Sequence, residues 1–92
     1  MKIVTRSQLS APWAEPDWED SSSVVVLLSL RNAPTELFAA RKARRGGFNE
    51  GKWFLSDTLG VVEWGTIRDM YAVLAVIRGE EGDTNNADQE PD

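Results

Sequence analysis

The chemistry open to this sequence is limited by two absent residue types, because it contains neither histidine nor cysteine. These side chains supply the commonest general base, the commonest nitrogen ligand for metals and the strongest nucleophile. A Ser-His-Asp or Cys-His constellation is therefore excluded, and so is zinc bound through nitrogen or sulfur. Paired carboxylates are the remaining option for catalysis.

The densest carboxylate group in the first half of the chain is formed by Asp17, Glu19 and Asp20, just before three serines. Two carboxylates can act as general acid and general base when their surroundings separate their pKa values. This group stands in a loop-like segment where we expect ordinary solvated acids. We predict that the protein is not an enzyme, has no catalytic residues, and uses no metal or other cofactor.

The same segment, Ser10–Ser23, carries Trp13 and Trp18 among prolines, serines and acids. One interpretation is that both indoles fold back and cover one end of the core. If either is exposed, it becomes an anchor for a partner, since tryptophan is enriched among interface hot spots. The partner-binding residues that we predict are Trp13, Trp18, Asp17 and Glu19.

A basic cluster in the middle of the chain offers a different function. It comprises Arg41, Lys42, Arg44 and Arg45, and Phe48 follows it. Such residues can contact phosphates while the ring stacks on a base. A solvated rim of the domain explains the same cluster without any ligand. Weak nucleic-acid binding is therefore the alternative function.

The sequence patterns that predict secondary structure are clearest in Gly51–Gly79. Two short segments rich in aromatic and β-branched residues, Lys52–Ser56 and Val61–Trp64, predict a hairpin whose link ends at Gly60. Alternation places Trp53 and Leu55 on one face of the first strand, and Glu63 of the second strand toward water.

After this hairpin the period changes, and the sequence predicts a helix over Thr66–Arg78. Apolar residues recur at spacings of three and four, at positions 67, 70, 71, 74 and 77. Thr66 is placed to cap the helix, Asp69 completes a capping box, and Gly79 can end it. The unbroken apolar run Met70–Ile77 also fits a buried strand, and this alternative stays open.

Three further strands are predicted. Val24–Leu30 is apolar on both faces, so we expect it to be central and covered on both sides, with the helix as one cover. Met1–Ser7 fits a short edge strand. Thr35–Arg45 contains helix-favouring residues, but its position between a turn and a glycine-rich loop favours a strand over Glu36–Ala43.

These elements predict an α+β fold: a small antiparallel sheet of about four strands with one C-terminal helix packed on it. Residues 1–79 form the single domain, with nine acids and ten bases, and residues 80–92 form a disordered acidic tail with six acids and no bases. The sequence has no stretch of about 20 apolar residues and no secretory signal, so we expect a cytoplasmic protein.

Short motifs across residues 13–64 resemble a class of small phage and prophage domains of unknown function. They are the Trp-x-x-Pro of Trp13–Pro16, the Gly-Lys-Trp-Phe of Gly51–Phe54 and the Val-x-Trp of Val62–Trp64. The chain departs from that class by continuing into Thr66–Arg78 where those domains have a proline-rich end. The resemblance implies a mobile-element origin and carries over no functional residue.

The function that we predict is a non-catalytic protein-binding module, as in a phage-encoded inhibitor or accessory factor that acts on a host protein. The partner's identity and the oligomeric state, including a homodimer, stay open at this stage.

Overall fold

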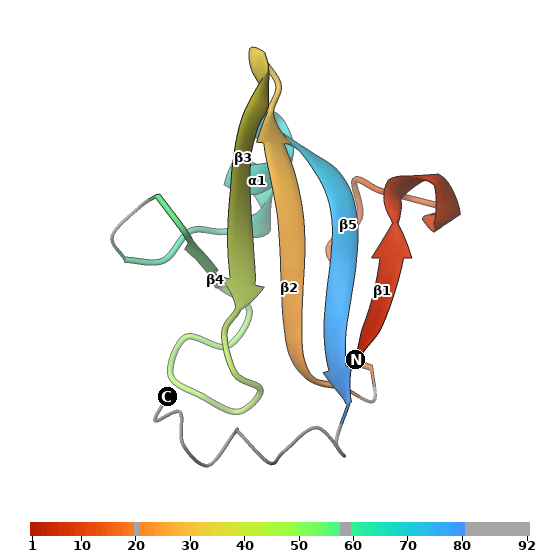
Figure 1. Cartoon of the computed structure of the whole chain (residues 1–92). Helices are drawn as coiled ribbons and strands as arrows, with labels where there is room; N and C mark the ends of the chain where they lie inside the picture. The colour runs from red at the N-terminus through yellow and green to blue at the C-terminus, as the bar shows by residue number, and fades with distance from the viewer. Residues whose placement is uncertain (20, 58–59, 81–92) are drawn as a thin grey trace.

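The computed structural model describes residues 1–19, 21–57 and 60–80. Five antiparallel strands form one sheet in the order β1-β5-β2-β3-β4, with one short α-helix beside it (Figure 1). The α+β class and the antiparallel sheet are confirmed, but the sheet has five strands, not about four. The elements are β1 Lys2–Thr5, the 3-10 helix η1 Arg6–Gln8, β2 Ser21–Leu30, β3 Ala33–Lys42, β4 Trp53–Leu55, α1 Trp64–Met70 and β5 Tyr71–Glu80.

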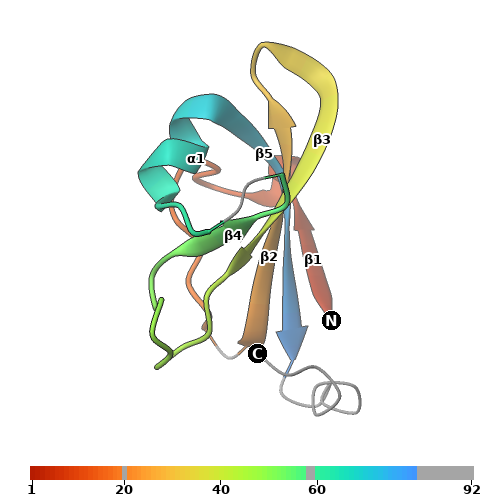
Figure 2. The same cartoon turned by 90° about the vertical axis from the view of Figure 1, so that its left-hand side faces the viewer.

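Strand β2 is central, as its apolar sequence predicts, and pairs with β3 on one side and β5 on the other. Its alternate side chains Val24, Val26 and Leu28 are fully buried. They point to the face of the sheet that α1 covers, which we call the core face. In Figure 2 the sheet is seen edge-on, with α1 and the chain leading into it on that one side.

The predicted helix over Thr66–Arg78 is wrong in both its start and its end. The helix begins at Trp64, follows Glu63 instead of a Thr66 cap, and ends at Met70. The buried-strand alternative is correct from Tyr71 onward, because Tyr71–Glu80 is strand β5. Arg78 and Gly79 therefore lie in a strand.

Long-range pairing explains why the second half of that segment is extended. The run from Tyr71 to Ile77 contains two valines and an isoleucine, and it lies between β1 and β2, where both of its edges find hydrogen-bond partners. The turn after β2 supports the helix end, since the Arg31 backbone N–H donates to the Met70 carbonyl at 3.1 Å and its guanidinium donates to the Arg68 carbonyl. These contacts satisfy carbonyls that a helix C-terminus leaves unpaired.

The predicted hairpin is confirmed in part. Its first strand is β4, and Trp53 exchanges both backbone hydrogen bonds with Val62, at 2.8 and 2.9 Å. The second strand stops at this bridge because the helix starts two residues later. Gly60 has the positive φ of 89° that the turn requires.

The hairpin side chains take the predicted faces. Trp53 and Leu55 are buried on the core face, and the Trp53 ring lies 5.2 Å from that of Trp64 between centroids. Glu63 is exposed and pairs with Lys52 at 2.9 Å, which lowers the pKa of the Glu63 carboxyl.

Burial raises the pKa of the Tyr71 hydroxyl, and the charge of Asp57 raises it further.

The other strand predictions are also confirmed. Met1–Ser7 contributes the edge strand β1, and Glu36–Ala43 lies within β3 except for its last residue. Strand β5 extends through Glu80, one residue past the predicted domain end. The predicted disordered tail otherwise lies outside the described residues. Among those residues, no helix has the length and apolarity needed to cross a membrane.

Candidate binding surfaces

The segment between η1 and β2 crosses the core face and is held there by one buried lysine. Lys42 of β3 is only 5% exposed, and its ammonium donates to Glu15 Oε2 at 2.7 Å and to the Pro16 carbonyl at 2.8 Å. Trp53 Nε1 donates to the same Glu15 oxygen at 3.1 Å. The Lys42 ammonium also lies 4.7 Å from the ring centroid of Trp18 and 5.1 Å from that of Trp53.

We call Glu15, Lys42, Trp18 and Trp53 the lysine clamp. The Lys42 ammonium, the Glu15 carboxylate and the Trp53 indole N–H all have partners in it, as a buried charge requires. The clamp joins the loop to the sheet, and it explains why the loop covers this end of the core. Sequence reasoning missed Glu15, although its spacing of two from Trp13 and three from Trp18 placed it inside the segment that was singled out.

The four predicted partner-binding residues have different roles in this arrangement. Trp18 is half-buried in the clamp, with the Arg45 guanidinium 5.2 Å from its ring centroid. Asp17 accepts from the Trp18 backbone N–H, and its carbonyl accepts from Arg78. Glu19, at a φ of 56°, lies 3.4 Å from Arg78. These three residues anchor the loop.

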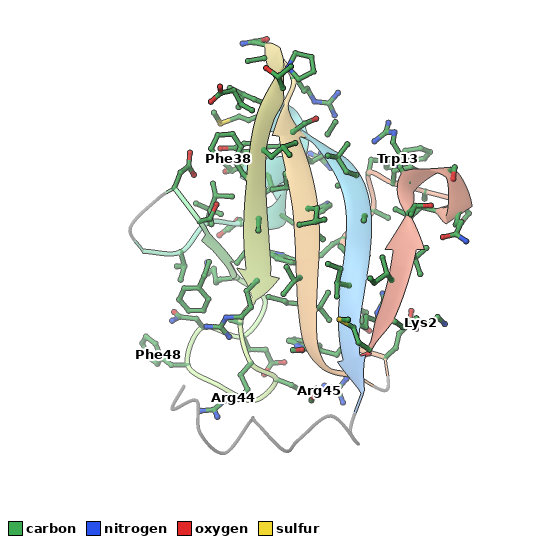
Figure 3. All side chains as sticks on the ribbon, viewed as in Figure 1. Lys2, Trp13, Phe38, Arg44, Arg45 and Phe48 are labelled. Atoms are coloured by element: carbon green, nitrogen blue, oxygen red, sulfur yellow. The ribbon has the colours of Figure 1, made fainter. Side chains whose placement is uncertain are left out.

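Trp13 is the exception among the four. Its side chain is largely exposed, while its backbone carbonyl accepts a hydrogen bond from Trp64 Nε1 at 2.9 Å. In Figure 3 it lies at the same edge as η1, away from Arg44 and Arg45. It therefore remains available for contact with a partner.

The predicted basic cluster is divided between surfaces. Lys42 is buried in the clamp, and Arg45 donates to the Glu19 carbonyl at 2.9 Å while it stacks on Trp18. Arg41 points to the opposite face of the sheet, where its guanidinium lies 4.8 Å from the centre of the Phe54 ring. The alternation of a β-strand separates Arg41 from Lys42, so the four charges cannot act together.

Part of the cluster does line a hollow at the end of the molecule. Phe48 is fully exposed there, near Arg44 (Figure 3). The hollow has a volume of about 240 Å³. Its lining residues are Arg41, Ala43, Arg44, Gly47, Phe48, Asn49 and Phe54.

The second face of the sheet, which we call the open face, is the largest feature that sequence reasoning did not assign. Register places two rows of side chains across it. The first runs through Ile3, Ile77, Val25, Arg41 and Phe54, and the second through Thr5, Ala75, Leu27 and Ala39. Leu37 adds to the same face on β3.

The open face is mostly apolar and accessible. Ile3 is 53% exposed, Leu27 40% and Leu37 69%. The covering elements α1 and the clamped loop lie on the core face, so within residues 1–19, 21–57 and 60–80 no second layer packs on the open face (Figure 2). The expectation that Val24–Leu30 is covered on both sides is thus not met by the described part of the chain. The helix expected as a cover is short and serves the core face alone.

No group of three or more acids that would hold a metal ion occurs among the described residues. Comparisons with protein families, with curated proteins and with solved structures found no match. A function for this protein is therefore inferred from its surfaces.

Proposed function

We propose that the protein is a non-catalytic protein-binding module and that its binding surface is the open face. The observation that carries this proposal is the row of side chains that crosses all five strands, apolar on four of them and charged at Arg41, with no covering layer among residues 1–19, 21–57 and 60–80. Monomeric proteins rarely leave an apolar patch above a few hundred Å² in water, and larger ones mark interaction sites. The proposal keeps the function that the sequence predicts and moves its surface from the loop to the sheet.

The strand sequences support this choice of surface. Strands β2 and β5 carry large apolar residues on both faces, as in Val24 to Leu28 and Val73 to Ile77. An antiparallel sheet with one face in water normally alternates between apolar and polar side chains. A sequence without that alternation fits a sheet that is covered on its second face when it functions.

The experiment that tests this proposal compares the two candidate surfaces directly. Tagged protein is used to capture partners from a lysate of the cells that encode it, after nuclease treatment. We expect Leu27→Asp to abolish capture of a defined protein, because a charge would be desolvated at the contact. We expect Trp13→Ala, which changes the loop, to leave capture unchanged. Capture that is lost with Trp13→Ala and retained with Leu27→Asp would move the binding site to the loop.

A second candidate function is weak binding of single-stranded nucleic acid in the hollow beside Phe48. The observation that favours it is that Arg41 and Arg44 line the same hollow as two phenylalanine rings. Two phosphate contacts predict a slope of about −1.4 for the logarithm of affinity against the logarithm of salt concentration.

Fluorescence titration of a labelled oligonucleotide at several salt concentrations measures this slope. We expect Arg44→Ala to make the slope shallower by about 0.7. Phe48→Ala should weaken binding by removing a stacking platform, without changing the slope. No detectable binding at low salt, or a slope that Arg44→Ala leaves unchanged, would rule out this site.

A further inference from the structure

The open face also indicates which partner it fits, and this inference rests on the proposed function. We propose that the partner is a second copy of the same chain, packed sheet against sheet around a two-fold axis. The two open faces would then form the interior of a β-sandwich, with α1 and the clamped loop on the outside of each copy. Size, relief and charge each support a second copy.

The size of the face suits a dimer. Strands β2, β3 and β5 have ten residues each, β1 has four and β4 has three, and each strand residue covers about 16 Å² of the face, about 3.4 Å along the strand by about 4.8 Å across it. The resulting footprint is about 600 Å² before the relief of the side chains is counted. A standard stable interface buries about 800 Å² on each partner. An identical sheet is a partner of matching length and width.

The surface shape of the open face is self-complementary. Leu27 is paired with Ala75 of β5 on one side and with Ala39 of β3 on the other, so a large side chain stands between two small ones. Side chains of facing sheets interdigitate at a spacing of about 10 Å between the sheets. A two-fold axis parallel to the strands and midway between β2 and β5 brings Leu27 of each copy over Ala75 of the other. The same rows thus supply both the projections and the spaces that receive them.

The charge distribution also favours a second copy over an unrelated protein. Arg41 is the charged member of the two rows, and it lies to one side, on β3 next to β4. The same axis places β3 of each copy over β1 of the other, so the two Arg41 guanidiniums do not meet. Different proteins orient one another with complementary charges, and the rows contain no carboxylate for that purpose. Residues 1–79 carry a net charge of only +1, and the net charge of −5 of the full chain comes from the six acids of residues 80–92.

Sedimentation equilibrium of the purified full chain across a broad dilution series is the test. We expect the wild-type chain to be a dimer that dissociates on dilution, and we expect Leu27→Asp to raise the dissociation constant by at least about a hundredfold. Leu37→Lys introduces a charge at a more exposed position of the same face and should act in the same direction. Met70→Asp, on the helix behind the core face, is the matched control and should dissociate as the wild type does.

Two measurements guard against a folding artefact. Circular dichroism and urea denaturation must show that each variant keeps the native fold. The variant Leu27→Thr, which retains strand preference, should also weaken the dimer.

Crosslinking provides a further test of the interface. Because the chain has no cysteine, Leu27→Cys provides a single thiol, and a short bismaleimide should join two such chains but not two Met70→Cys chains.

The outcomes separate this inference from the proposed function. A wild-type chain that is monomeric at every concentration, or a dimer that Leu27→Asp and Leu37→Lys leave intact, would overturn the second-copy proposal. If the monomer still captures a different protein from lysate through the open face, the binding-module function stands with another partner. A monomer that captures nothing would overturn both.

Discussion

Replacing Ile67 by alanine is expected to lower the free energy of unfolding by about 3 to 4 kcal/mol. Ile67 is fully buried, and it and Trp64 are the two helix residues that pack into the core. Truncation removes buried methyl groups and leaves a cavity that a single short helix cannot close by itself. Domains of this size have a total stability of roughly 4 to 12 kcal/mol, so the loss is a large fraction. Urea denaturation should show a lower midpoint with an unchanged slope.

Met70→Ala is the matched control, because Met70 belongs to the same helix but is 51% exposed. We expect it to change the free energy of unfolding by about 0.5 kcal/mol or less. The two variants, Ile67→Ala and Met70→Ala, also distinguish a helix that ends at Met70 from the longer helix that the sequence predicts. A helix through Arg78 would bury Ile67 and Met70 on one face, so equal losses in the two variants would contradict the short helix.

Glu15→Ala is expected to destabilise the protein by about 3 kcal/mol, through the lysine clamp. Removing this carboxylate leaves the Lys42 ammonium buried without its counter-charge and the Trp53 indole N–H without its acceptor. Breaking a buried ion pair from one side costs about 3 to 5 kcal/mol. We place this pair at the low end because the Glu15 side chain keeps 36% exposure and is partly screened by solvent. Urea denaturation measures the loss.

The control for the clamp is Glu36→Ala, an exposed glutamate on β3, which should cost about 0.5 kcal/mol or less. A double-mutant cycle then isolates the coupling. We expect Glu15→Ala combined with Lys42→Met to cost at least about 1 kcal/mol less than the sum of the single variants, because the double variant buries no unpaired charge. Additive losses would show that the two residues act separately.

The clamp shows how much of the site could be predicted from the sequence. Trp18 was identified, and the interpretation that it covers the core is the one that its half-buried position fits. Its partner Lys42 was assigned to a charged surface cluster, because a run of basic residues in sequence does not reveal which of them a strand turns inward. Glu15 carried no signal of its own, since an acid between two prolines resembles any other loop acid.

The elements that follow from the sequence alone are those whose preference is local. They are the central strand Val24–Leu30, the positive φ at Gly60 and the inward-facing pair Trp53 and Leu55. A run of β-branched residues, the backbone freedom of glycine and the alternation of a strand each act within a few residues, and here they agree with the final fold.

Tertiary structure decided where α1 ends and β5 begins. From Tyr71 to Ile77 the chain has apolar residues at every position, and such a run satisfies both a helical and an extended period. Its backbone becomes a strand because β2, distant in sequence, pairs along its length, and β1 pairs with its other edge from Ala75 onward. That pairing adds a fifth strand to the sheet and leaves only the short helix α1 on the core face.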